Sequence, residues 1–234
     1  MSNILTLGDC YLSLKEIESE SIDLILTDPP YNISRQSNFN KNSKNKKYMN
    51  ISLEFGDWDK EEIDLDSLFG EFKRVLKNGG TCIIFYDVWK SSKIKFYVDK
   101  WKFKQLRICQ WVKTNPVPIN SKINYLSNSI EFFFTFVKGR KKTFNSKYDK
   151  GIYHYPICHG VERLDHPTQK PIRLIDELIL KHSQMGDVVL DAFGGTGTTA
   201  ESCIKNSRDY VIFERDVHFF DMIKKRIQQK NELK

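Results

Sequence analysis

The sequence has no paired cysteines and no long apolar runs, and each absence excludes a class of protein. The five cysteines form no C-x-x-C pair, so neither a zinc ribbon nor a disulfide framework is indicated. His154, His159 and His166 fit no zinc-binding spacing, so no metal site is expected. No apolar run approaches the ~18 residues that a membrane helix needs, and no signal peptide opens the chain. We therefore expect a cytoplasmic protein with reduced thiols.

Length and charge set further bounds. With 234 residues the chain is long enough for one α/β domain with a substantial core and too short for two. It has 37 Lys and Arg residues against 30 acids, a net charge of +7 and a pI near 9.0. This balance favours a polyanionic partner, although simple solubility would also account for it.

The most informative stretch is Thr27-Asp28-Pro29-Pro30-Tyr31-Asn32. It follows the apolar residues 22–26, which read as a short buried strand. Two prolines cannot continue a strand, so Asp28 is expected at the carboxyl end of a strand. Asp28 and the Pro29 carbonyl could accept both N–H bonds of an exocyclic base amine and give its nitrogen a usable lone pair. Tyr31 would stack on the base after it has been flipped out of the duplex.

Other segments give the expected elements. Strands are predicted at residues 4–7, 81–86, 106–112 and 130–137, and helices from Asp64 and over residues 89–99. Asn78-Gly79-Gly80 is expected to end the first of these helices as a left-handed cap. The phenylalanines of residues 130–137 are expected in the core.

Two segments are rich in basic residues. Residues 35–47 carry five basic side chains and no acid, and they leave the proposed catalytic turn directly. We expect a mobile loop that meets phosphates, with a solvated excursion as the alternative. Residues 138–150 hold six basic residues and one acid, which suggests DNA backbone contacts or a short target-recognition insert.

The last third of the chain contains two ligand-binding patterns. His166-Pro167-Thr168-Gln169-Lys170-Pro171 precedes a predicted helix, with proline in the first turn. Residues 188–200 run from a strand through Gly194-Gly195-Thr196-Gly197 into a helix, so bare amides can approach a ligand. A strand at residues 210–213 then ends in Glu214, which could bind ribose hydroxyls. This pattern also fits a nicotinamide dinucleotide fingerprint, but it is not a P-loop, because no Gly-Lys-Ser/Thr follows.

Together these motifs resemble the S-adenosylmethionine-dependent amino-methyltransferases of DNA, whose catalytic tetrapeptide is Asp/Asn/Ser-Pro-Pro-Tyr/Phe/Trp. The resemblance covers Gly8 to Glu214, and Ala192 replaces a proline that is frequent in the family. An Asp-Pro-Pro-Tyr start usually marks enzymes acting on adenine N6. The catalytic turn precedes the glycine turn, which is the circularly permuted order of the family's β group.

The resemblance implies the following roles. Asp28, Pro29 and Tyr31 would be catalytic. S-adenosylmethionine would be held by Asp9, Cys10, Asp28, Pro30, Thr168, Gln169, Lys170, Asp191, Phe193, Gly195, Thr196, Gly197, Thr198, Thr199 and Glu214. DNA would be contacted by Arg35, Lys41, Lys44, Lys46, Lys47, Lys113, Arg140, Lys141 and Lys142.

We therefore expect one domain over residues 1–234 with a doubly wound, Rossmann-like methyltransferase sheet, circularly permuted. A basic loop would span about 33–57 and a short target-recognition insert about 138–165. The expected activity is methylation of adenine N6 in double-stranded DNA, in a bacterial or phage restriction–modification system with a separate restriction endonuclease. Homodimerisation stays open. The alternatives are a cytosine-N4 or RNA amino-methyltransferase and, more distantly, a dinucleotide-binding oxidoreductase.

Overall fold

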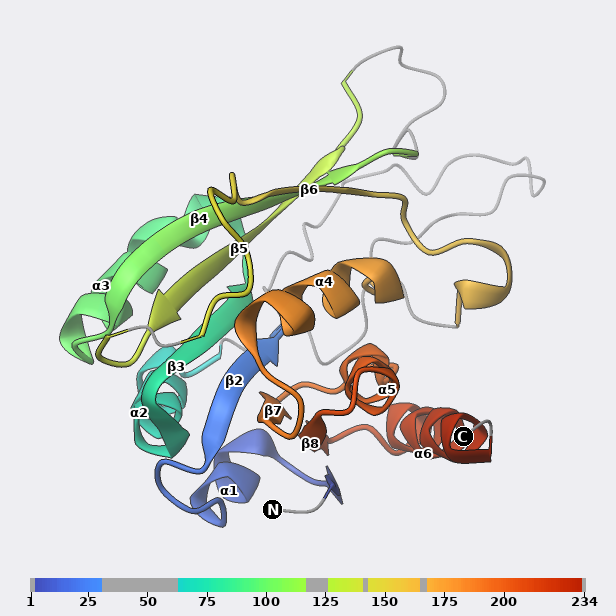
Figure 1. The fold of residues 1–234 in the computed structure, drawn as a ribbon, viewed down its shortest axis with the longest axis horizontal. Helices are drawn as coiled ribbons and strands as arrows, with labels where there is room; N and C mark the ends of the chain where they lie inside the picture. The colour runs from blue at the N-terminus through green and yellow to red at the C-terminus, as the bar shows by residue number, and fades with distance from the viewer. Residues whose placement is uncertain (1–2, 31–62, 117–125, 141–142, 165–167, 233–234) are drawn as a thin grey trace, which may run out of the picture.

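A computed structural model describes residues 3–30, 63–116, 126–140, 143–164 and 168–232. These residues form an eight-stranded sheet (Figure 1). From one side to the other the strands are β1 (Ile4–Leu7), β8 (Asp209–Glu214), β7 (Val188–Asp191), β2 (Ile22–Thr27), β3 (Leu76–Phe85), β5 (Ile130–Val137), β4 (Lys104–Lys113) and β6 (Ile152–Tyr155).

The strand directions create one functional edge. Every described pairing is parallel except those of β5 with β3 and β4, so only β5 among the described strands runs against the rest. The carboxyl ends of the other strands therefore meet at one edge, called here the carboxyl edge, together with the amino end of β5. The opposite side is called the amino edge. In open α/β sheets the carboxyl edge is where ligands bind.

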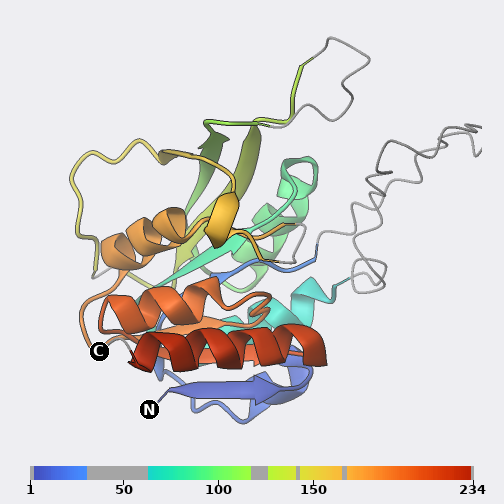
Figure 2. The same cartoon turned by 90° about the vertical axis from the view of Figure 1, so that its right-hand side faces the viewer.

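Helices cover both faces of the sheet, and together with the parallel strands they confirm the predicted doubly wound architecture (Figures 1 and 2). One hydrophobic cluster includes residues of α1 (Cys10–Lys15), α2 (Leu65–Val75) and α3 (Ser91–Lys100). The other includes residues of α4 (Ile172–His182), α5 (Thr198–Lys205) and α6 (Val217–Glu232). Short 3-10 turns lie at η2 (Val88–Lys90) and η3 (Gly160–Glu162). In the described part of the chain, no helix has the length and apolar character needed to cross a bilayer.

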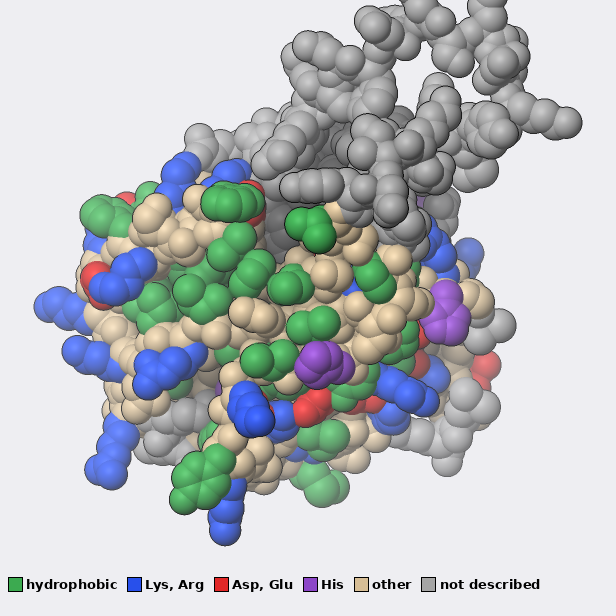
Figure 3. Space-filling view, turned by 90° about the horizontal axis from the view of Figure 1, so that it is seen from above, with side chains coloured by type: hydrophobic (Ala, Val, Ile, Leu, Met, Phe, Trp, Pro, Cys, Tyr) green, Lys and Arg blue, Asp and Glu red, His purple; other side chains and the backbone are tan. Residues whose placement is uncertain are grey.

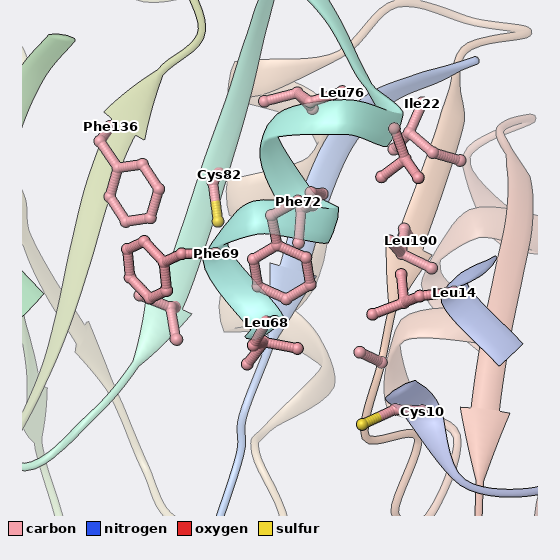
Figure 4. Packing of buried hydrophobic residues seen from close by; sticks show 14 of the residues in the cluster. Cys10, Leu14, Ile22, Leu68, Phe69, Phe72, Leu76, Cys82, Phe136 and Leu190 are labelled. Carbon is pink, nitrogen blue, oxygen red and sulfur yellow. The ribbon is translucent and has the colours of Figure 1, made fainter. Parts of the chain in front are cut away.

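Aromatic rings fill the centre of the first cluster, which includes Phe134 and Phe136 of β5. Phe133 lies in the second cluster and Phe132 is only partly buried, so the expected burial of the phenylalanines of residues 130–137 holds for three of the four. Phe69 of α2 stacks on Phe136 with ring centroids 5.3 Å apart, and Figure 4 shows this pair beside Cys82 of β3. Burying one such side chain contributes about 1.5–3 kcal/mol relative to exposing it. The clustered rings therefore fix α2 firmly against β3 and β5.

The predicted glycine cap of α2 is wrong. The helix ends at Val75, and β3 begins with Leu76, five residues earlier than expected. Gly79 does have a positive φ of 94°, but its N–H donates to the Lys138 carbonyl at 2.7 Å, at the end of β5. At Gly80 a Cβ would lie 2.8 Å from the Asp23 carbonyl oxygen. Gly79 and Gly80 therefore belong to a bulged strand and do not cap α2. The pairing of β3 with distant strands outweighs the local capping signal.

Two elements were not anticipated from the sequence. The short strand β6 pairs with β4 and divides the predicted insert of residues 138–165 into two parts. The long helix α6 packs on α5 and β8, with Ile223 in the second cluster. Both turn out to matter for the placement of the site.

A buried carboxylate links α4 to α5 and gives a test of this packing. Asp176 accepts hydrogen bonds from Ser202 Oγ at 2.6 Å, Lys205 Nζ at 2.6 Å and Asn206 Nδ2 at 2.9 Å. Asp176→Ala would remove the acceptor of the buried Ser202 hydroxyl, while Asn206 keeps its hydrogen bond to the Ser202 carbonyl, so we expect a loss of about 1–3 kcal/mol in the free energy of unfolding. Urea denaturation measures it.

The matched control is Asp99→Ala. Asp99 also pairs with a lysine, Lys95, but both side chains are exposed. In this variant the free energy of unfolding should fall by no more than about 1 kcal/mol. Equal losses in the two variants would contradict the assigned role of Asp176.

Candidate active site

The strand order brings the distant sequence motifs together. At the carboxyl edge β1, β8, β7 and β2 lie side by side. Their ends carry Asp9, Glu214, Asp191 and Asp28 in that order. The Gly8 amide donates to the Glu214 carbonyl at 2.9 Å, which fixes the first two ends against each other. The motifs predicted to bind cofactor and to carry catalysis therefore lie in one continuous row along the carboxyl edge, which is called the rim below.

The catalytic turn begins where β2 ends. Thr27 is buried, and its hydroxyl donates to Asp191 Oδ1 at 2.9 Å. Asp28 follows, half-buried, and Pro29 is buried behind it. Asp28 Oδ2 accepts a hydrogen bond from Lys170 Nζ, in an ion pair. Tyr31 lies outside the described residues.

A row of alternating charges, Asp28, Lys170, Glu131 and Lys113, extends from Asp28 along the carboxyl edge toward β5 and β4. The Lys170 side chain is only 6% exposed, and its ammonium also lies 3.4 Å from Glu131 Oε2. Glu131 Oε1 in turn pairs with Lys113 at 2.8 Å. Burial disfavours the charged form of both central groups, but their partners outweigh it: the pKa of Lys170 is raised, and that of Glu131 is lowered. The charged forms of Lys170 and Glu131 are therefore stabilised by their partners despite burial.

Sequence reasoning missed Glu131. It stands second in β5, a strand otherwise made of apolar residues and one threonine. A lone acid in such a strand was the available signal. Its partners could not be inferred, because they come from β4 and from the segment before α4, and their meeting depends on the reversed direction of β5.

The glycine turn requires its glycines for two different reasons. Gly195 and Gly197 have positive φ values of 52° and 79°, which side-chain-bearing residues rarely adopt. Gly194, which was not singled out, is needed for space: a Cβ there would lie 2.5 Å from Ile212 Cγ2 and 3.2 Å from the Phe213 carbonyl oxygen. The turn thus lies directly against β8, with its amides at the rim.

Asp191 is the anchor of this turn. Its Oδ1 accepts from Thr27 and from the Phe193 amide, and its Oδ2 accepts from the Thr199 hydroxyl at 2.7 Å. Burial raises the pKa of Asp191 to about 7, despite these hydrogen bonds. The carboxyl group predicted to bind cofactor is therefore engaged within the protein, where it joins β2, β7 and α5.

Arg226 of helix α6 also contacts the glycine turn and the start of α5. Arg226 donates to the Thr196 carbonyl at 3.0 Å and to Thr198 Oγ1 at 3.2 Å, and it forms an ion pair with Glu201. The hydroxyls of Thr196 and Thr198 also lie 3.4 Å apart. Both hydroxyls thus lie within an internal network. Arg226 itself was missed, since nothing in the local sequence marks it.

The residues at β1 and β8 fit a nucleoside. Glu214 Oε2 accepts the Gly195 amide at 2.8 Å and Oε1 accepts the Asp216 amide at 2.9 Å, which leaves lone pairs for a vicinal diol. Burial raises the pKa of Glu214. Asp9 caps α1 through Oδ1 alone, accepting from Tyr11 and Leu12. Cys10 is the first residue of α1, where backbone amides lack helical partners.

Of the hexapeptide before α4, the structure describes Thr168 to Pro171. Gln169 is buried, donates to the Glu162 carbonyl at 2.9 Å and accepts from the Leu164 amide at 2.8 Å. Pro171 is the N-cap of α4, one position before the predicted first turn. Gln169 therefore holds the segment after β6 in place, and Lys170 is the member that reaches the catalytic turn.

The residues predicted to contact DNA are not brought together in the described structure. Residues 35–47, Lys141 and Lys142 lie outside the described residues, and Lys113 is paired with Glu131. Arg140 follows β5 at the amino edge, opposite Asp28. On the face seen in Figure 3, the described Lys and Arg side chains are dispersed around apolar ones.

The first half of the predicted insert is tied to the amino edge. Asn145 Nδ2 donates to the carbonyls of Leu180 and Ser183 at the end of α4, and Lys181 pairs with Asp149 at 2.5 Å. Residues 143–151 therefore lie far from the catalytic turn. The described part of the insert that reaches the carboxyl edge is residues 156–164, after β6.

Comparison with known proteins gives a consistent picture. Residues 22–225 match a family model described as DNA methylase (N6_N4_Mtase). The type II methyltransferase M.HinfI of Haemophilus influenzae is 31% identical, over 97% of this chain and 68% of the relative. M2.MboI of Moraxella bovis is 29% identical, over 97% of this chain and 90% of the relative.

Solved structures share the fold. The M1.HpyAVI–SAM complex superposes with a TM-score of 0.71 at 26% identity, over 95% of this chain and 98% of the other. The PvuII DNA methyltransferase, described as cytosine-N4-specific, gives a TM-score of 0.72 at 16% identity, over 100% of this chain and 91% of the other. The second likeness concerns the fold alone.

The raised pKa of Asp191 predicts a pH dependence of stability. Between about pH 4 and pH 7 the native carboxyl keeps its proton, whereas the unfolded one, with a pKa near 3.9, has lost it. The native state then binds more protons, so the contribution of Asp191 to the free energy of unfolding falls as pH rises through this window. Each unit of pKa shift corresponds to about 1.4 kcal/mol.

Asp191→Asn removes this titration while keeping a similar shape. Urea denaturation of both proteins at pH 4 to 8 measures the effect, and other titrating groups cancel in the difference. The stability of the wild type relative to the variant should decline up to about pH 7 and then level off. A difference that is constant with pH would show that Asp191 titrates normally.

Proposed function

The chain belongs to the DNA methylase family, and we propose that it transfers a methyl group from S-adenosylmethionine to the N6 amine of adenine in double-stranded DNA. The observation that carries this proposal is the position of Asp28. It lies at the carboxyl end of β2, next to the glycine turn that follows β7, and Glu214 lies one strand further, at the end of β8. This position supports Asp28 as the acceptor for a base amine beside a bound nucleoside.

The chemistry required of this chain is to make a poor nucleophile usable. The N6 lone pair of adenine is delocalised into the ring, and Asp28 and the Pro29 carbonyl would each accept one of its N–H bonds. S-adenosylmethionine supplies an electrophilic methyl group on its sulfonium. On methyl transfer the amine would give up one proton, and Asp28 is the acceptor that we propose for it. Tyr31 would stack on the flipped base.

The proposed cofactor contacts follow the rim. Glu214 would accept the ribose hydroxyls, Asp9 would accept from the adenine amine of the cofactor, and the Cys10 amide would donate to its ring. Because Gly195 and Gly197 carry no side chain, the cofactor can approach their backbone closely. Thr168, whose carbonyl accepts from Lys170 Nζ at 3.4 Å, would contact the methionine end of the cofactor together with Asp28 and Pro30.

The remaining alternatives differ in the base or the nucleic acid. A cytosine-N4 or RNA methyltransferase would use the same acceptors on another exocyclic amine. The oxidoreductase alternative finds no support, because the family match spans the catalytic turn as well as the glycine turn. The permuted motif order, homodimerisation and a separately acting restriction endonuclease remain predictions.

The central test combines the product with the catalytic residue. DNA incubated with enzyme and labelled S-adenosylmethionine is digested to nucleosides, and the wild type should yield N6-methyladenine. Asp28→Ala should abolish this product while keeping most of the cofactor affinity, because the lost acceptor acts mainly on the amine in the transition state. Asp28→Asn should be milder, since its amide oxygen still accepts one bond.

Calorimetric titration with S-adenosylmethionine confirms that each variant retains its fold and cofactor site. Wild-type turnover by Asp28→Ala would remove Asp28 from the mechanism. N4-methylcytosine as the product would keep the mechanism and change the base. Methyl transfer to RNA but not to DNA would change the substrate class.

A second test concerns the basic residues of 35–47, which we propose contact phosphates. Replacing Lys41, Lys44 and Lys46 by alanine should weaken DNA binding. It should also reduce the slope of log affinity against log salt by about 0.9 per lost contact. Base preference should be kept, because phosphate contacts position the duplex without reading it. Binding isotherms at several salt concentrations measure both quantities.

The matched control removes the same charge from the amino edge. Lys102 and Lys104 lie at the start of β4, and Lys147 lies between residues held against α4; all three side chains are exposed. The triple alanine variant of these lysines should leave the salt slope unchanged. Equal slopes for both triple variants and the wild type would mean that residues 35–47 make no phosphate contact.

A further inference from the structure

The row of charges beside the catalytic turn has a feature that the proposed function leaves unassigned. The ammonium of Lys170 lies between two carboxylates that come from different strands, Asp28 after β2 and Glu131 in β5. It also lies 5.1 Å from the centroid of the Phe85 ring, at the end of β3. This buried cation therefore joins three neighbouring strand ends.

Glu131 itself occupies a well-defined position. It lies in the regular part of β5, opposite Trp111 of β4, so the sheet ladder sets its backbone. Its two carboxylate oxygens contact different lysines, Oε1 with Lys113 and Oε2 with Lys170. Asp28, by contrast, lies beyond the end of β2, in a turn without ladder pairing. Glu131 therefore fixes the position of Lys170 relative to β5, and Lys170 in turn fixes the position of Asp28.

The charge balance of the row gives Glu131 a second effect. Two carboxylates and two ammonium groups sum to zero, and Lys170 contacts both carboxylates, through a hydrogen bond to Asp28 and an ion pair with Glu131 at 3.4 Å. Without the charge of Glu131, Lys170 would be drawn wholly to Asp28. A carboxylate that is fully paired with a buried ammonium is a weaker and differently oriented acceptor for a neutral amine.

We propose that Glu131 is a positioning residue for methyl transfer, which holds Lys170 in a shared position so that Asp28 keeps the orientation and acceptor strength needed for the base amine. The inference rests on the proposed role of Asp28 as that acceptor. The proposal distinguishes two roles of Lys170, which are holding Asp28 in position and binding the methionine carboxylate of the cofactor. A lysine with the second role alone would have no need of Glu131.

The test is Glu131→Gln, which keeps the size of the side chain and removes its charge. Single-turnover methyl transfer at saturating S-adenosylmethionine and DNA should slow by about 10- to 100-fold, the scale of a misplaced catalytic group. The dissociation constants for S-adenosylmethionine and for DNA should stay within about two-fold of the wild type. Glu131→Asp restores the charge at a shorter reach and should recover part of the rate.

Asp149→Asn is the matched control. Asp149 is a largely buried carboxylate that pairs with Lys181, but it lies at the amino edge. The variant should lose thermal stability without losing the rate of methyl transfer. A similar loss of rate in both variants would mean that Glu131 acts only through folding. A wild-type rate in Glu131→Gln would overturn the proposal, as would reduced affinity for S-adenosylmethionine with an unchanged rate at saturation.

A second measurement does not depend on activity. Because Asp28 and Glu131 share one buried lysine, either can partly satisfy Lys170 when the other is lost. The double variant Asp28→Asn/Glu131→Gln should therefore lose more in thermal midpoint than the sum of the single variants. Additive losses would show that the two carboxylates are not coupled, and this result would stand even if the wild type methylated no adenine.

Discussion

The pairing of β2 with β7 is the contact on which the site depends. An aspartate fastens these strands at each end. At the amino edge Asp23 of β2 accepts from the Val188 amide of β7 at 3.0 Å, and at the carboxyl edge Thr27 of β2 donates to Asp191 of β7. The residue after Thr27 is Asp28, and the residues after Asp191 form the glycine turn. A shift of one strand against the other would separate Asp28 from the glycine turn.

Much of this arrangement could be predicted from local sequence. The double proline after an apolar run marks the end of β2, and the glycine turn lies between an apolar strand and a helix, so the sequence predicts both motifs at strand ends. Glu214 was placed in the same way, as the acid that ends a strand. These signals are short-range, because strand ends and tight turns are encoded by neighbouring residues.

The remaining features depend on contacts between distant segments. Glu131 lies 39 residues before Lys170 (170 − 131) and Arg226 lies 30 residues after Thr196, and nothing near either residue identifies its partner. The same limit explains the error at Asn78-Gly79-Gly80, where pairing with the end of β5 decides the outcome. It also explains why basic composition does not show where Arg140 lies: the reversal of β5 sends the following residues to the amino edge.

That reversal also determines which connections can be exchanged. Because β5 enters the sheet from the carboxyl edge, the connection between β4 and β5 starts and ends there, as do the connection leaving β2 and the one following β6. Each is anchored by residues that belong to the sheet or to the rim, so its interior can vary in length and sequence without altering the ladder. Grafts of these three connections from a relative should therefore spare residues 28–31 after β2 and Thr168 to Pro171 before α4, because residues proposed for catalysis and cofactor binding lie within the first and the third connection.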